Sequence, residues 1–80
     1  MELQLIGPTS SRIMDILWLE AQTTSGSFVI KQGHAPLIAL LAPNKELTVK
    51  LPDGSTTIIT IVQGILEVTR THITLLLTHE

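Results

Sequence analysis

The sequence predicts an all-β protein, and three observations support that prediction. Ile, Val and Thr, which are β-branched, number 10, 4 and 11 and make up 25 of the 80 residues. Such side chains are stiff at χ1 and pack well on a pleated surface. Alanine, the strongest helix former, occurs only four times, and no helix start or stop signature is present. Turn signals recur about every 8–12 residues, a spacing typical of small sandwiches and barrels.

Apolar and polar residues alternate with a period of two in three segments, residues 46–51, 64–69 and 72–78. This period indicates strands with one buried face. In the third segment Leu76 falls on the polar side and breaks the alternation. Each of the three segments is therefore predicted to be a strand with one face in the core.

Taken in chain order, glycine, proline and polar clusters delimit short antiparallel strands. Gly7-Pro8 ends the first strand, residues 23–26 form a polar turn, and Pro52-Asp53-Gly54 is a tight hairpin signal. The strands expected between these turns are residues 3–6, 13–21, 28–30, 47–51, 56–62, 65–69 and 73–78. The predicted fold is a small antiparallel β-sandwich or flattened barrel of about nine to ten short strands, one domain over residues 1–80.

Two segments are apolar on both faces, residues 37–42 and 58–62. One interpretation makes both of them central strands that are buried on two sides. The other leaves an outer face exposed for another protein, because a sandwich of this size usually keeps one sheet face wet. The sequence leaves both interpretations open.

Composition excludes several classes of protein. Lys plus Arg is 5 and Asp plus Glu is 7, for a net charge of −2, and only 15% of the chain is charged. A disordered tail needs more charge, and a nucleic-acid domain needs a clustered cationic face. The chain has no cysteine, and its longest apolar run, residues 36–43, is far shorter than the roughly 20 residues of a spanning helix. A small domain with a thin stability margin suggests that a partner covers part of it.

No residue set points to catalysis or to a cofactor. The three histidines, His34, His72 and His79, lack second ligands at metal-binding spacing. No nucleophile elbow surrounds a serine, and the turn at Ser25-Gly26-Ser27 lacks the lysine and helix of a phosphate loop. We therefore expect no enzyme activity, no metal and no cofactor. His34 is expected to bond backbone groups of its own loop, and the two aromatic residues, Trp18 and Phe28, are expected in the core.

Two motifs resemble a known family. Residues 33–37 are GHAPL, and residues 63–68 are QGILEV. Together with the opening strand and turn at residues 5–9, the segment 26–30 and the closing strand 73–76, they resemble the N-terminal β-sandwich domain of the F-type ATP synthase epsilon subunit, called delta in mitochondria. The order and spacing cover nearly all 80 residues.

The sequence departs from the family pattern at three places. Gln63 replaces the first glycine of the usual pair, so backbone freedom there is expected to fall to Gly64 alone. Asn44-Lys45 stands where a glycine is common, and asparagine tolerates the same left-handed geometry. The sequence ends at Glu80 without the C-terminal helical hairpin that inhibits hydrolysis in relatives, so we expect a subunit that couples but does not inhibit through that hairpin.

The resemblance implies a non-catalytic rotor subunit of the central stalk. It would link the gamma subunit to the c-subunit ring and couple proton translocation to ATP synthesis within the F-type complex. It would bind no nucleic acid and would meet the membrane only through the complex. Its expected place is that of a peripheral protein at the cytoplasmic face of a bacterial inner membrane, with the organellar equivalent as the alternative. By resemblance, two loops would face the c ring: Ser25, Gly26, Ser27 and Phe28, and Gln32, Gly33 and His34.

A second set is expected to face gamma or the adjacent core. It comprises Ala35, Pro36, Leu37, Ile38, Leu40, Gly64, Ile65, Leu66 and Val68. Which alternate residues face outward depends on register, because a slip of one residue inverts the faces. The alternative function is a small β-sandwich module that binds a peptide or an apolar ligand.

Overall fold

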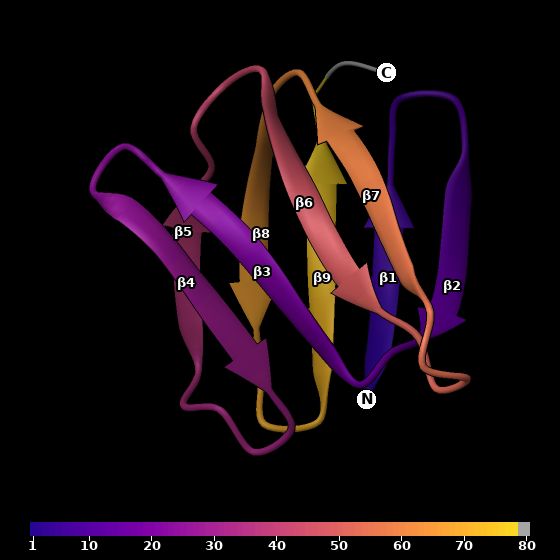
Figure 1. Ribbon diagram of the computed structural model, residues 1–80. Coiled ribbons are helices and arrows are strands. Elements are labelled where there is room, and N and C mark those ends of the chain that lie inside the picture. Colours follow the sequence, from indigo (N-terminus) through magenta and orange to yellow (C-terminus); the bar gives the residue numbers. More distant parts are fainter. Residues whose placement is uncertain (79–80) are drawn as a thin grey trace.

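Nine strands form two sheets that pack face to face in the computed structural model, which describes residues 1–78 (Figure 1). The strands are β1 (Glu2–Ile6), β2 (Ser11–Asp15), β3 (Trp18–Thr23), β4 (Gly26–Lys31), β5 (Leu37–Leu40), β6 (Lys45–Lys50), β7 (Thr56–Ile61), β8 (Gly64–Val68) and β9 (His72–Leu77). The five-stranded sheet has the order β2-β1-β9-β8-β5, and the four-stranded sheet has the order β4-β3-β6-β7. The predicted all-β sandwich is confirmed.

The core lies between the two sheets and follows the period-two alternation. On β8, Gly64, Leu66 and Val68 are buried, whereas Ile65 and Glu67 are exposed. The largest fully buried side chains are Leu3, Ile16, Leu19, Ile30, Leu47, Leu66, Ile73, Leu75, Val49 and Val68. Among residues 1–78 no buried residue is polar or charged. Burial of apolar side chains, about 1.5–3 kcal/mol each, is therefore what holds the sheets together.

One strand pair is parallel, which corrects the expectation of a wholly antiparallel fold. β1 pairs with β9 in parallel, with Leu3 opposite Ile73 and Leu5 opposite Leu75. The two strands are the first and the last of the chain, and turn signals predict only pairings between consecutive strands. The parallel pair closes the sheet around the chain ends, and all four of these side chains are buried.

The strand expected over residues 13–21 is in fact two strands in different sheets. β2 ends at Asp15 and β3 begins at Trp18. Between them the Ile16 N–H donates to the Met1 carbonyl at 2.8 Å, and the Leu17 N–H donates to the Lys50 carbonyl at 2.7 Å. These bonds carry the chain from one sheet to the other, with the buried Ile16 side chain at the corner. No glycine or proline marks this corner in the sequence.

Both of the two-faced apolar segments lie at sheet edges, so the central-strand interpretation is wrong. β5 ends the five-stranded sheet and β7 ends the four-stranded sheet. Ile38 and Leu40 on β5 are 73% and 66% exposed, and Ile58 on β7 is 58% exposed. The second interpretation, an apolar outer face, is the one that the geometry supports.

The expectation for the aromatic residues holds for Phe28 and fails for Trp18. Phe28 packs against the core cluster. Trp18 precedes the fully buried Leu19 on β3, so its side chain lies on the outer face of the four-stranded sheet, where it is half-buried between Lys31 and Lys50 on the neighbouring strands. In the sequence, a single aromatic residue next to an apolar one does not indicate which face of the sheet its side chain occupies.

Two special backbone positions have different physical causes. Asn44 adopts φ 59°, which confirms the left-handed turn expected there. Gly64, in contrast, does not take a positive φ, so the expected backbone freedom is not used. A Cβ at Gly64 would lie 3.1 Å from the Leu76 carbonyl oxygen, a tight contact that β9 would have to relieve by shifting a few tenths of an ångström, so the glycine favours close packing of β8 on β9.

The β6–β7 hairpin turn predicts a measurable pH effect. The Ser55 hydroxyl and N–H donate to Asp53 Oδ1 at 2.6 and 2.9 Å, and both bonds hold the pKa of Asp53 below its ordinary value of 3.8. Because the folded pKa is lowered, the stabilisation is present above the ordinary pKa and is lost as the pH falls through the folded one. We expect an NMR titration midpoint for Asp53 below 3.8, and a rise toward 3.8 in Ser55→Ala. An unchanged midpoint in Ser55→Ala would show that the hydroxyl is not the main cause.

Candidate interaction surface

The outer face of the five-stranded sheet carries a continuous row of apolar side chains. Cross-strand pairing joins Leu40 to Ile65, Ile65 to Leu76, and Leu76 to Ile6, across four adjacent strands. Ile65 and Leu76 are 37% and 42% exposed although they lie on interior strands. We call these four residues the apolar row. A contiguous exposed apolar patch of this kind is typical of a protein interaction site.

A second row lies beside the apolar row on the same face. It runs from Ile38 through Glu67, Thr74 and Gln4 to Ile13. Both end residues are strongly exposed isoleucines. These two rows are therefore apolar along the first row and at both ends of the second, with a polar strip through the middle of the second.

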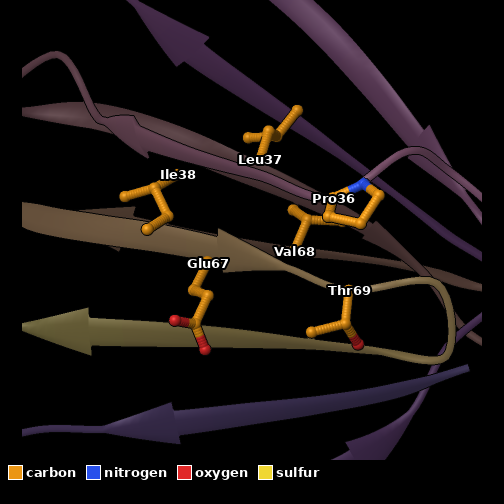
Figure 2. Close-up of a pocket in the computed structure, with 6 residues that line it drawn as sticks. All are labelled: Pro36, Leu37, Ile38, Glu67, Val68 and Thr69. Atoms are coloured by element: carbon orange, nitrogen blue, oxygen red, sulfur yellow. The ribbon is translucent and has the colours of Figure 1, made fainter.

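An open groove of about 430 Å³ lies at one end of this face, between β5 and β8. Figure 2 shows its lining residues, Pro36, Leu37, Ile38, Glu67, Val68 and Thr69. Four of the six are apolar, and the Glu67 carboxylate projects at the rim, away from Pro36 and Leu37 (Figure 2). The groove can take an apolar side chain next to a charged group.

The charges on the outer face of the five-stranded sheet are all negative. Alternation from the buried residues of each strand places Glu2, Asp15 and Glu67 on this face and no lysine or arginine. Asp15 accepts from the Met1 ammonium at 3.1 Å, which is the ion pair found among residues 1–78. Within that range Glu67 has neither a hydrogen bond to its carboxylate nor an ion pair.

The GHAPL loop is held by backbone hydrogen bonds. The Gly33 N–H donates to the Arg70 carbonyl at 3.1 Å, which ties this loop to the β8–β9 turn, and the His34 N–H donates to the Lys31 carbonyl. The His34 Nδ1 lies 2.7 Å from the Ala35 carbonyl oxygen, which can only accept, so Nδ1 carries the proton. The prediction that His34 bonds backbone groups of its own loop is confirmed.

The two loops predicted to face the c ring lie at opposite ends of the molecule. Ser25 and the residues around it form the β3–β4 turn, whereas Gln32 to His34 follow the other end of β4 (Figure 1). β4 separates them by about 15–20 Å, at roughly 3.3 Å per residue. The structure therefore does not bring the two sets together at one end, and their contact with a ring stays a prediction.

The residues predicted to face gamma divide between surface and core. Ile38, Leu40 and Ile65 lie on the outer face, and Ala35 and Pro36 are exposed in the loop that leads to it. Leu37 is half-buried and packs against the core. The other three, Gly64, Leu66 and Val68, are buried between the sheets. That these strands face gamma stays a prediction, and their register decides which of the predicted residues are available on the surface.

Sequence reasoning missed three members of this surface, Ile6, Ile13 and Leu76. Leu76 had a signal, since it broke the polar side of the alternation in its strand. Ile6 and Ile13 had none, because they come next to the others only through the β1–β2 and β1–β9 pairings.

The described residues hold no arrangement suited to metal binding. Within residues 1–78 no group of three or more His, Asp or Glu side chains is placed to hold an ion. No helix in that range is long and apolar enough to cross a membrane. His79, considered above as a ligand, lies outside the described residues.

The chain belongs to the family of the ATP synthase delta/epsilon chain β-sandwich domain, whose model matches residues 7–79. The family resemblance drawn from the GHAPL and QGILEV segments is confirmed. No curated protein sequence matches the chain.

Solved structures share the fold at low sequence identity. A chain of the mitochondrial ATP synthase of Euglena gracilis, in a structure of OSCP, F1 and c-ring, superimposes with a TM-score of 0.88 and 19% identity over 96% of this chain and 49% of that one. A chain from the central stalk and c-ring of the Tetrahymena thermophila mitochondrial ATP synthase gives 0.81 and 18% over 98% and 63%. The chain thus spans 49% and 63% of the length of these two similar chains.

Proposed function

We propose that this domain is a non-catalytic component of the central stalk of an F-type ATP synthase. It would link the gamma subunit to the c ring and take part in coupling proton translocation to ATP synthesis. The observation that carries the proposal is the apolar row, an exposed surface that a rotor partner would cover. The similar solved structures, one of them a central stalk with its c-ring, support this assignment.

The parts of the domain have separate roles in this proposal. The outer face of the five-stranded sheet binds gamma, because it is the face with the apolar row and the groove. The β3–β4 turn, with Ser25, Gly26, Ser27 and the start of β4, faces the c ring through polar, uncharged groups. The loop of residues 32–34 follows the other end of β4 and leads through Pro36 to the groove, so in this proposal it lies on the gamma side, which replaces its predicted contact with the c ring. The domain is peripheral to the membrane and bound through the complex, at the cytoplasmic face in a bacterium.

Binding of the gamma subunit tests the proposal. We expect the 80-residue chain and the gamma subunit of the same organism to form a one-to-one complex in a calorimetric titration. Because apolar area is buried, the heat capacity change of binding should be negative. Absence of a complex at micromolar concentrations would contradict the proposed function.

Reconstitution tests the coupling role. Residues 1–78 form strands and no helix, so no inhibition by a helical hairpin is assigned to them. Added to complexes depleted of their own epsilon subunit, the chain should restore ATP-driven proton pumping without strong inhibition of ATP hydrolysis. Strong inhibition of ATP hydrolysis by these 80 residues would contradict the proposed role, which is coupling without inhibition.

A further inference from the structure

The apolar surface described above contains one feature that an apolar partner alone does not satisfy. Glu67 lies on β8, opposite Ile38 on β5 and two residues from Ile65 on its own strand. It lines the groove with Pro36, Leu37 and Ile38 (Figure 2). Any partner segment that covers the groove and the apolar row also covers this carboxylate.

Covering an unpaired carboxylate is unfavourable. Removal of an ionised group from water costs far more than apolar burial returns, unless a cation and hydrogen-bond donors replace the water. Within residues 1–78 the structure supplies neither to Glu67, and the same face carries no lysine or arginine. The missing positive charge must therefore come from the partner.

We propose that Glu67 determines which kind of protein segment binds to this face. The occupant is a segment with an aliphatic side chain for the groove and a lysine or arginine that pairs with the Glu67 carboxylate. This inference rests on the proposed function, in which the segment belongs to the gamma subunit. Glu67 acts as a specificity residue, because a partner that lacks the cation leaves a buried, unpaired charge.

Glu67 variants test this proposal in a titration with the gamma subunit at low and high salt. Glu67→Gln keeps the size of the side chain and removes its charge, and it should weaken binding about tenfold, as for loss of a desolvated charge pair. Glu67→Lys should weaken binding by about 100-fold or more, because it places two cations together. The affinity of Glu67→Gln for gamma should also depend less on salt concentration than the wild-type affinity does.

Glu46→Gln is the matched control. Glu46 is an exposed glutamate on the outer face of the four-stranded sheet, opposite Thr60, and its neutralisation should leave gamma affinity unchanged. Circular dichroism melting of each variant reports whether the fold is retained, which we expect because both glutamates are exposed.

The possible outcomes distinguish a failure of this inference from a failure of the proposed function on which it rests. A wild-type chain that binds no gamma contradicts the proposed function and the inference with it. If wild type and Glu67→Gln bind gamma with the same affinity and the same salt dependence, the inference about Glu67 is overturned and the proposed function is not. A wild-type chain that sediments as a dimer, and that Glu67→Lys turns into a monomer, would show that a second copy covers this face, which also overturns it.

Discussion

Replacement of Leu66 by alanine is expected to lower the free energy of unfolding by about 2–5 kcal/mol. Leu66 is fully buried on β8, between Leu75 on β9 and Ala39 on β5. Truncation there removes apolar contacts from the inner face of the five-stranded sheet and leaves a cavity. Because β8 is hydrogen-bonded to a strand on each side, the sheet cannot move to fill that cavity. The total stability of a chain of this size is only about 4–12 kcal/mol, at 0.05–0.15 kcal/mol per residue. Leu66→Ala should therefore bring the domain close to the point of unfolding.

Urea denaturation monitored by the fluorescence of Trp18, the single tryptophan, measures this loss. The adjacent residue provides the control, since Ile65→Ala removes a similar volume from the outer face of the same strand. Because Ile65 is partly exposed, its truncation should cost no more than about 1 kcal/mol. Equal losses in the two variants would contradict the register of β8 and with it the assignment of inner and outer faces.

The contrast between Leu66 and Ile65 also shows what sequence patterns can predict here. Alternation placed β6, β8 and β9 within one or two residues, because each of them has one buried face and a turn signal at its ends. It could not locate the corner at Ile16 and Leu17, where four consecutive apolar residues, 16–19, hide the change of sheet. The hydrogen bonds that make this corner go to Met1 and Lys50, which are distant in sequence.

The interaction surface was less predictable than the fold for the same reason. The GHAPL loop and β8 could be selected from local motifs, but a surface consists of residues from several strands. Ile6 and Leu76 become neighbours through the parallel β1–β9 pair, which no hairpin signal in the sequence predicts. The unpaired charge of Glu67 likewise depends on the absence of lysine and arginine from the outer face of the four other strands of its sheet. Such properties arise from the strand order and are not visible along the chain.

Introduction of a charge into the apolar row is expected to abolish most of the binding to gamma while the domain stays folded. Leu76 is the best position, because it lies between Ile65 and Ile6 in the row and its side chain is 42% exposed. Leu76→Lys would bury an unpaired ammonium beneath the partner and would oppose the cation that we infer near Glu67. A central interface position of this kind contributes about 2 kcal/mol or more, so affinity should fall at least about 30-fold.

Leu40→Lys should act in the same direction with a smaller effect, because Leu40 lies at the edge of the sheet and is 66% exposed. Ile58→Lys is the matched control, since Ile58 is an exposed isoleucine on an edge strand of the other sheet. Its charge should leave gamma affinity unchanged. The free energy of unfolding of all three variants should lie within about 1 kcal/mol of the wild-type value, which is the range that substitutions at exposed strand positions cover. If Leu76→Lys binds gamma as the wild type does and Ile58→Lys does not, gamma covers the four-stranded sheet, and the apolar row needs another partner.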